Sequence, residues 1–464
     1  MKMPTKPASQ GAADTVRLRR ALTLWDLVIY GIVVIQPTAP MPVFGVVDKI
    51  ARGHVVTTIL IGMVAMLFTA ISYGRMARVY PSAGSAFTYV GREFHPAFGY
   101  ITGWSMAMDY MLNPILCTIW CSEAARNIAP AIPYAVWVVI IALLFTGLNL
   151  RGIRSSAKSN RLLAGALGVV IVIFLAAAAR YISSLSHGPG FFTRPFYNPH
   201  TFSPPLVLTG ASIAVLTYIG FDGISTLSEE ARNPRRDILR ATVLVCLITG
   251  VLASIEVYTA QLAWPSGRPF PNIDTAFSFV AGQTVASPGA SASVLRGAWL
   301  FQLVNVALLV ASVGSGSSAQ LAAARLLYGM GRSNALPKRF FGAIEPHRKI
   351  PRNNVIVVGA IALAGAFVLS YQLSAEMLNF GAFIAFMGVN LAAFKHYFLR
   401  QKKTISNLVP PLTGVLICFY IWLNLRTPAQ IAGGVWLCLG ILYGAWKTNW
   451  FRGRTILFDT PQGE

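Results

Sequence analysis

Two stretches of the sequence interrupt hydrophobic segments with residues that could bind a polar solute. The stretch 30–42 contains three prolines within six residues, and the stretch 217–225 places Asp222 between Gly220 and Gly223. Each proline removes a backbone N–H and clashes with the carbonyl one turn earlier, so three together predict an unwound stretch. Broken helix ends offer free N–H and C=O groups to a ligand. The alternative is that these are the prolines and glycines common in membrane helices.

Asp222 is an ionisable residue inside the second interrupted segment that could bind a ligand or a proton. With Tyr218 and Phe221 beside it, its carboxylate could bind an ammonium group, since carboxylates and aromatic faces both attract cations. It could instead take up a proton as the coupling site of a transporter. The third possibility is structural, a carboxylate that caps the second half of a broken helix.

Two further acids lie inside hydrophobic segments, where charged residues are costly and mark functional sites. Asp109, next to Tyr110, could be a cation partner or could bond to a neighbouring helix. Glu256 is a candidate for proton coupling.

The elements that carry these residues are hydrophobic helices. The 464 residues are 55% hydrophobic and 12% charged, with a mean hydropathy of +0.58. A soluble protein carries about twice that charged fraction. A spanning helix needs ~20 mostly apolar residues, and the runs do not alternate as barrel strands do. The sequence predicts an all-α membrane protein with twelve transmembrane helices, near 25–47, 55–74, 97–120, 134–150, 162–182, 206–228, 241–264, 298–324, 354–371, 377–394, 408–425 and 428–446.

Positive charge indicates the orientation of these helices. The chain has 38 Lys and Arg against 16 Asp and Glu, a formal charge of +22 and a pI of about 10.2. Thirty of the 38 fall in the two termini and the even-numbered connections. Both termini are therefore predicted to be cytoplasmic. The charge then reflects topology and does not indicate a nucleic-acid partner. The expected partners are the small-molecule substrate, membrane lipids and a coupling proton, and the short loops suit a bacterial inner membrane.

Enzyme and metal signatures are missing from the sequence. No G-x-x-x-x-G-K-[ST] phosphate loop occurs, and the six histidines are scattered without cysteine partners at metal spacing. Five cysteines do not make a disulfide scaffold. We expect no cofactor, no metal and no enzymatic activity.

The two interruptions occupy matching places in the chain. Each falls in the first hydrophobic run of a five-helix block, 25–182 or 206–398, followed by two further helices in 408–446. The predicted tails are 1–24 and 447–464. Interrupted helices at matching places in two halves indicate a transporter with inverted repeats and a binding site at the membrane midplane.

Several motifs resemble the amino acid–polyamine–organocation (APC) transporters, and among them the putrescine-importer-type permeases. The motifs are Phe68–Gly74, Tyr80–Tyr89, Gly103–Tyr110, Gly220–Asp222 with Thr226–Glu230, Asn233–Arg236, Arg325–Arg332 and Asn379–Phe383. The resemblance covers nearly the whole chain. It implies a five-plus-five inverted-repeat (LeuT-like) fold with two added helices, and alternating access around helices 1 and 6.

One departure from the family bears on the substrate. Amino acid carriers of the family have a Gly-small-Gly turn in helix 1 that cradles the substrate carboxylate, where this chain has Pro37, Thr38 and Ala39 after Gln36. Proline cannot donate, which favours an amine without a carboxylate. Putrescine importers, however, carry an acid in this stretch, where this chain has Pro42. The substrate therefore stays open between an amine and an amino acid.

The expected coupling ion rests more on what the resemblance to the family implies than on particular residues of this chain. Some members place a lysine in helix 5 at a sodium position, and the matching place here, around Leu167, is apolar. Four serines in helix 8 could form a sodium site or a helix-packing surface: Ser312, Ser315, Ser317 and Ser318. Proton coupling or exchange is favoured, with Asp222 and Glu256 as candidates.

The predicted function is secondary active transport of a small organic amine such as putrescine, or of an amino acid. The alternatives are an amino acid permease or exchanger with a non-standard carboxylate site, and a membrane receptor or channel on the same scaffold. The predicted substrate-binding residues are Gln36, Thr38, Ala39, Asp109, Tyr110, Tyr218, Gly220, Phe221 and Asp222.

Overall fold

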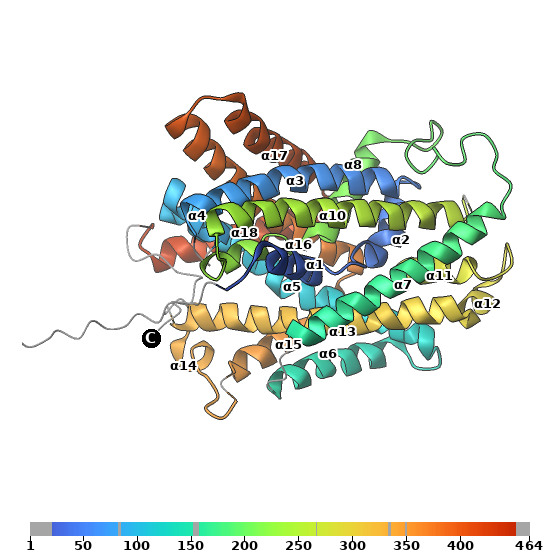
Figure 1. Ribbon diagram of the computed structural model, residues 1–464. Helices are drawn as coiled ribbons and strands as arrows, with labels where there is room; N and C mark the ends of the chain where they lie inside the picture. The colour runs from blue at the N-terminus through green and yellow to red at the C-terminus, as the bar shows by residue number, and fades with distance from the viewer. Residues whose placement is uncertain are drawn as a thin grey trace, which may run out of the picture.

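The computed structural model describes residues 21–81, 85–151, 157–265, 267–332, 336–348 and 350–451. Within these ranges the chain is helical and contains no β-strand, as predicted (Figure 1). Most of the predicted tails, residues 1–20 and 452–464, lie outside the described ranges. The helices are α1 (Leu24–Ile35), α2 (Pro40–Ile50), α3 (Val55–Val79), α4 (Ser85–Glu93), α5 (Pro96–Ile128), α6 (Tyr134–Leu150), α7 (Ala157–Ser183), α8 (Pro204–Ala214), η1 (Val215–Tyr218), α9 (Gly223–Thr226), η2 (Leu227–Glu229), α10 (Pro234–Ala263), α11 (Ala276–Gln283), α12 (Ala292–Gly297), α13 (Trp299–Arg332), α14 (Lys338–Phe341), α15 (Arg352–Val368), α16 (Tyr371–Ala393), the π-helical η3 (Phe394–Gln401), α17 (Ile405–Leu423) and α18 (Thr427–Lys447).

Each of the twelve predicted hydrophobic runs coincides with one or more of these helices. In the described part of the chain, eight helical segments are long and apolar enough to cross a membrane, and the bent pair α1–α2 would be a ninth. The apolar helices α6 and α15 have 17 residues each. The chain is therefore a multi-pass membrane protein by length and composition, while the count of twelve crossings stays a prediction.

The first predicted break lies between α1 and α2. Thr23 and Asp26 cap the start of α1 reciprocally: the Thr23 N–H donates to the Asp26 carboxylate at 3.0 Å, and the Asp26 N–H donates to Thr23 Oγ1 at 3.3 Å. The helix ends at Ile35, and Gln36 follows with a φ of +69°. The helical conformation resumes at Pro40, where α2 begins, and the axes of α1 and α2 differ in direction by 53°. The unwinding predicted from the prolines is confirmed.

The second break is longer than the sequence indicated. After α8 ends at Ala214, the chain continues through η1, α9 and η2, which are only three or four residues each. Gly220 adopts a φ of +119°. Hydroxyl groups then compete for backbone carbonyls: Ser225 Oγ donates to the Asp222 carbonyl and Thr226 Oγ1 to the Gly223 carbonyl, both at 2.6 Å. Asp222 precedes α9, but its side chain makes no capping hydrogen bond there.

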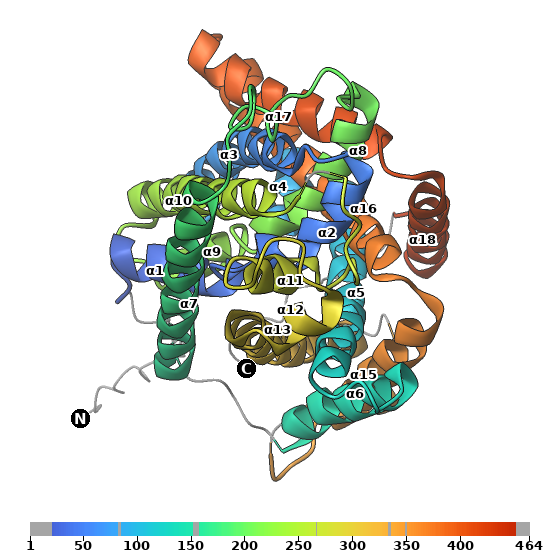
Figure 2. The same cartoon turned by 90° about the vertical axis from the view of Figure 1, so that its right-hand side faces the viewer.

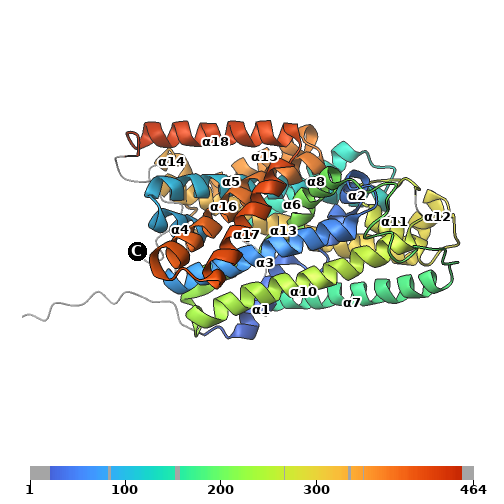
Figure 3. The ribbon, with the colours of Figure 1, turned by 90° about the horizontal axis from the view of Figure 1, so that it is seen from above.

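Long helices surround the two breaks and hold them. In Figures 1 and 3 most of them run along one direction, which gives the molecule two ends. Helix α10 packs along α3, and α5 packs against both α13 and α16. Helices α11 and α12 lie over the end that faces the viewer in Figure 2.

The described chain begins and finishes at the opposite end, beside α4 and α14 (Figure 3). Leu22 forms a parallel β-bridge with Ala231, just after the second break. At the same end, the Phe451 ring lies 5.8 Å from the ring of Tyr100, near the start of α5. The sequence places Lys and Arg preferentially in the connections predicted for this end.

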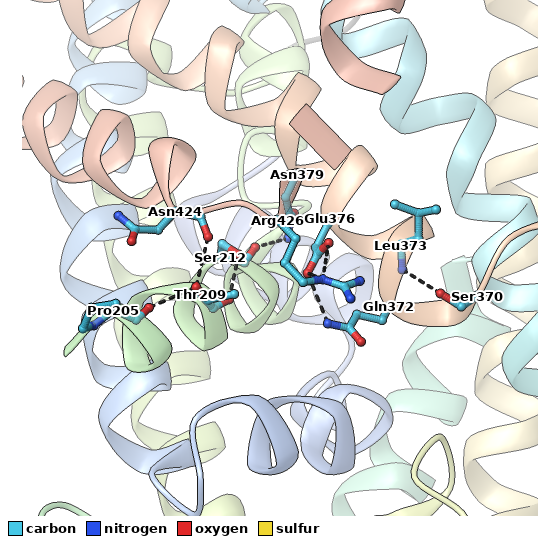
Figure 4. Close-up of polar contacts among 10 residues, drawn as sticks. All are labelled: Pro205, Thr209, Ser212, Ser370, Gln372, Leu373, Glu376, Asn379, Asn424 and Arg426. Atoms are coloured by element: carbon cyan, nitrogen blue, oxygen red, sulfur yellow. Dashed lines mark hydrogen bonds and ion pairs between the residues drawn. The ribbon is translucent and has the colours of Figure 1, made fainter. Parts of the chain in front are cut away.

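Polar contacts from α16 and from the α17–α18 connection hold the first half of the second broken span (Figure 4). Arg426 Nε donates to the fully buried carboxylate of Glu376 at 2.7 Å. One turn along α16, Asn379 Nδ2 donates to the Ser212 carbonyl of α8 at 2.5 Å. Thr209 Oγ1 of α8 donates to the carbonyl of Asn424, between α17 and α18. Helix α8 is thus fixed to α16 and to the α17–α18 connection.

Candidate substrate-binding site

A cavity of about 410 Å³ lies between the two helix breaks. Its walls come from α1 and the first break, from α5, α7 and α13, and from the second break. Non-helical backbone at membrane depth is tolerated where it lines a cavity, which is the arrangement here. The two interruptions, far apart in the sequence, therefore meet at one place.

Five of the predicted residues line this cavity: Gln36, Asp109, Tyr110, Gly220 and Asp222. The two carboxylates come from different elements, α5 and the second break. They are close enough for the charge of Asp222 to act on Asp109. The described lining residues include no Lys, Arg or His. The described lining thus brings two acidic groups together without a basic side chain among its residues.

Tyrosine hydroxyls and amides complete the polar lining. Tyr30 and Tyr110 line the cavity, and both lie within the range of electrostatic interaction with Asp222. Gln36 Nε2 donates to the Ala311 carbonyl of α13 at 3.1 Å, and Asn113 Oδ1 accepts from Cys117 Sγ at 3.3 Å. A small cation here would meet carboxylates and aromatic faces together.

The cavity lining also includes three polar residues that were not predicted from the sequence: Tyr30, Asn113 and Thr226. A signal for Asn113 was present, because it follows Asp109 by four residues and so lies on the same face of an apolar helix. Tyr30 and Thr226 carried no such signal.

Four predicted substrate-binding residues do not line the cavity. Tyr218 is buried and its hydroxyl donates to the Ile59 carbonyl of α3 at 2.8 Å. Phe221 is buried against Tyr73, with ring centroids 5.5 Å apart. Thr38 is 2% exposed, and Ala39 is the N-cap of α2. In this arrangement these residues hold the breaks in place instead of facing the solute.

Glu256 lies apart from the cavity. Its side chain is fully buried, and neither carboxylate oxygen has a hydrogen-bond partner in the described structure. The coupling role predicted for it stays a prediction.

The wall formed by α7 and α13 is mostly apolar, with two hydroxyls. Leu163, Ala164 and Leu167 come from α7, so the place where some family members have a lysine does face this cavity. Ser315 and Ser318 come from α13. No group of three or more His, Cys, Asp or Glu side chains that could hold a metal ion occurs in the described ranges.

The described lining of the cavity lies more toward one end of the molecule. On α7 it falls in the first half of the helix, from Leu163 to Leu167, and on α13 at and beyond the middle, from Gly314 to Ala322. These halves of α7 and α13 run toward the end that carries α4 and α14. At the other end, the ring of Phe277 packs 5.6 Å from Phe44 and 4.7 Å from Phe174. Every residue of α11 is buried there. This packing closes the cavity from the α11 end.

Apolar helices that break beside a polar cavity, closed at one end and extending toward the other, are typical of a membrane transporter. The model of the amino acid permease family matches residues 44–435. The chain is 34% identical over 449 residues to the low-affinity putrescine importer PlaP of Escherichia coli strain K12, covering 94% of this chain and 95% of that protein.

More distant relatives are also transporters. The branched-chain amino acid permease BcaP of Lactococcus lactis subsp. cremoris strain MG1363 is 26% identical over 462 residues, covering 91% of this chain and 93% of BcaP. The mitochondrial cationic amino acid transporter 3 of Arabidopsis thaliana is 25% identical over 413 residues, covering 83% of this chain and 64% of that transporter. The chain belongs to the amino acid permease family of APC transporters, so it is a membrane transporter and not an enzyme.

Proposed function

We propose that this permease moves a small organic amine, such as putrescine, across the plasma membrane by alternating access. The observation that carries the proposal is the pair Asp109 and Asp222 in one cavity whose described lining has no basic side chain. Two carboxylates match the charge of a diamine, and ammonium–carboxylate hydrogen bonds are roughly twice as strong as neutral ones. The similarity to a putrescine importer supports the same substrate class.

The backbone of the first break supports a substrate without a carboxylate. Pro37 has no N–H, and the N–H groups of Gln36 and Ala39 donate to Ile32 and Gln36 carbonyls, at 3.0 and 3.1 Å. Of these four residues, only Thr38 keeps an N–H without a backbone partner, and Thr38 is buried. The first break therefore presents little that could cradle a carboxylate.

The second break also disfavours a substrate carboxylate. The carboxylate of Asp222 lies beside the backbone N–H groups of Gly220, Asp222 and Gly223. A helix break of this kind attracts an anion, and here the chain supplies its own. A substrate carboxylate would have to displace Asp222 or meet its charge.

The proposed architecture has twelve crossings in two inverted five-helix repeats, 25–182 and 206–398, followed by 408–446. The broken spans are the first of each repeat. In this proposal the end with α4 and α14 faces the cytoplasm of a bacterial inner membrane, with both termini there, and the excess of Lys and Arg in the connections predicted for that end supports the orientation. The cavity then faces the cytoplasm, and α2, α8 and α11 would separate in the outward-facing state.

For coupling, we propose a proton or exchange of solutes. Asp222 lines the cavity and would release a proton when an ammonium group binds, whereas Glu256 lies outside the cavity and would act through α10. A matched pair of variants, Asp222→Asn and Glu256→Gln, separates the two in uptake driven by a pH gradient.

An amino acid permease or exchanger is the second candidate. Relatives named amino acid permeases favour it, together with the donors Ser315, Ser318 and Asn113 on the cavity wall, which could bind a carboxylate without the usual turn.

Uptake into proteoliposomes tests the proposal, with putrescine paired with ornithine and cadaverine with lysine. The diamines should be taken up and their carboxylated parents should not. Asp237→Asn, which neutralises an acid on α10 outside the cavity, is the matched control for Asp222→Asn. Uptake of ornithine and lysine in preference to the diamines would replace the proposal by the second candidate.

A further inference from the structure

A second cavity, of about 630 Å³, lies near the end of the molecule that carries α11 and α12 (Figure 1). Three segments form it: the end of α2 with the loop that follows, the loop after α10, and the α7–α8 connection. It shares no lining residue with the cavity at the helix breaks. Its volume falls within the range of about 300–1,000 Å³ typical of small-molecule sites.

Side-chain hydrogen bonds hold the three segments together. Gln261 Nε2 donates to the Gly53 carbonyl at 2.5 Å, and its Oε1 accepts from the Val56 N–H at 3.1 Å. The N–H of Asn198 donates to Nε2 of the buried His54 at 3.1 Å. Specific side-chain hydrogen bonds from Gln261 and His54 therefore fix the three segments relative to one another.

The lining is amphoteric, with one carboxylate and several cations. Arg268 is engaged, because it stacks over Trp264 at 4.9 Å and donates to Gln283 at 3.0 Å. Lys49, Arg52 and Arg194 form no ion pair within the described structure.

The single carboxylate of the described lining is that of Asp48, which lies beside the Gln261 side chain. One wall is aromatic: the Trp264 and Phe270 rings stack with centroids 4.9 Å apart, and Phe44 meets Phe270 edge-on at 5.8 Å. The cavity thus offers a cationic region, one acid and an apolar surface.

We propose that this outer cavity is a binding site for an α-amino acid. The carboxylate lies toward Arg52, Arg194 and Lys49, the ammonium group toward Asp48, and the side chain against the aromatic wall. Arg194 lies over the Phe191 ring at 5.6 Å, but none of the three cations has a carboxylate partner in the described structure. A diamine would be repelled by them, and a simple anion would be repelled by the Asp48 carboxylate; a zwitterion satisfies both regions. The site is separate from the one proposed for transport.

Its position gives binding a consequence. Phe44 lines this cavity and also packs against Phe277, which closes the central cavity from this end. An amino acid held against Phe44 and Asp48 contacts α2, the outer half of the first broken span. Occupancy would therefore stabilise the closed outer end and slow the return to the outward-facing state.

Isothermal titration calorimetry tests the site on the full-length permease in phosphatidylcholine nanodiscs, which contain no anionic headgroups. The probes are L-leucine, 3-methylbutylamine and 4-methylpentanoate, which carry both charges, the ammonium only and the carboxylate only. We expect saturable binding of L-leucine, with the two single-charge probes weaker by about tenfold or more.

The variants locate the binding. Asp48→Asn, and Arg52→Gln combined with Arg194→Gln, should each weaken L-leucine binding by about tenfold. Arg180→Gln, an exposed arginine near the end of α7 outside this cavity, should leave it unchanged. Asp222→Asn should abolish diamine uptake yet retain L-leucine binding. Loss of L-leucine binding in Asp222→Asn, equal binding of 4-methylpentanoate, or no saturable L-leucine binding in the unmodified permease would overturn the proposal.

Discussion

The side chain of Gln36, at the break of the first span, donates a hydrogen bond to the carbonyl of Ala311 on α13, at 3.1 Å. Gln36 also adopts a φ of +69°, which is uncommon for a residue with a Cβ. The residue therefore holds a strained break against a helix from the other half of the chain. Strained backbone of this kind persists where the surrounding structure over-determines it.

Replacing Gln36 separates these two contributions. Gln36→Leu removes the hydrogen bond and keeps the strain, whereas Gln36→Gly removes both. A hydrogen bond of this kind contributes about 1 kcal/mol, so Gln36→Leu should lower putrescine uptake by roughly fivefold. If the bond to Ala311 positions the break, Gln36→Gly should also be impaired. Full uptake by Gln36→Gly would show that the backbone conformation alone matters.

The two-carboxylate cavity predicts a change of selectivity in Asp109→Asn. Putrescine should lose one of its two ionic contacts, whereas butylamine, with one ammonium group, should keep its contact with Asp222. Loss of a charged hydrogen bond costs about 1.5–3 kcal/mol, so the preference for putrescine over butylamine should fall by roughly tenfold or more. Competition of both amines against labelled putrescine in proteoliposomes measures this ratio. An unchanged ratio, with uptake of both amines reduced equally, would remove Asp109 from substrate contact.

The Glu376–Arg426 pair predicts an asymmetric loss of stability. Glu376 is fully buried while the Arg426 side chain is 39% exposed. Arg426→Ala would leave a buried carboxylate without its cation and should lower the free energy of unfolding by roughly 2 kcal/mol. Glu376→Gln leaves the Arg426 cation, which can reach solvent, and the new glutamine amide can still accept a hydrogen bond from Gln372. The free energy of unfolding should therefore fall less in Glu376→Gln than in Arg426→Ala. Thermal unfolding of both variants in detergent tests this order, and an equal or reversed order would contradict it.

Asp274, in the loop between α10 and α11, predicts a pH dependence of stability. Burial, reinforced by the nearby Glu123 carboxylate and opposed by Arg126, raises the pKa of Asp274 to about 6 from the ordinary 3.8. The folded state therefore holds this proton more tightly than the unfolded chain. The contribution of Asp274 to stability should rise as the pH falls from about 7 to about 4.

Asp274→Asn should remove that contribution. The change in melting temperature on going from about pH 7.5 to about pH 5 should be more positive in the unmodified permease than in the variant, because the asparagine does not titrate. An identical pH difference in both proteins would show that Asp274 does not carry the effect.

The helices and the positions of both breaks could be predicted from the sequence, because runs of apolar residues and clusters of proline and glycine act locally. The first break matched its prediction, since Pro40 can begin a helix but cannot continue one. The second break was predicted over 217–225 but runs from Val215 to Glu229, where the hydroxyls of Ser225 and Thr226 bond to nearby carbonyls.

The site was harder to predict in its details. Beyond a break, the helical phase is lost, so the sequence could not show that Tyr218 and Phe221 turn away from the cavity while Asp222 lines it. On the unbroken α5 the helical phase holds, and Asp109 and Tyr110 both line the cavity, while their contact with a substrate stays a prediction. The pairing of Glu376 with Arg426 joins distant segments and left no local pattern.

Gly220 and Gly223, on either side of Asp222, provide a matched pair for the second break. A Cβ on Gly220 would lie 2.9 Å from Val34 Cγ1 of α1, and its φ of +119° is one that other residues rarely adopt. A Cβ on Gly223 would meet nothing within 4 Å. Gly220→Ala should therefore shift the backbone that positions Asp222 and reduce putrescine uptake by about a hundredfold, since strain of this kind costs about 1–3 kcal/mol and misplaced groups add to the loss.

Gly223→Ala should retain uptake within about twofold, because alanine also favours the short helix that begins there. Uptake and surface expression of both variants, measured side by side, separate a loss of function from a loss of folding. Normal uptake by Gly220→Ala would mean that the second break can relax without moving Asp222, and the carboxylate would then not depend on this glycine for its place in the cavity. A loss of equal size in both variants would instead point to a requirement for flexibility across the whole break, which the backbone of Gly220 alone could not explain.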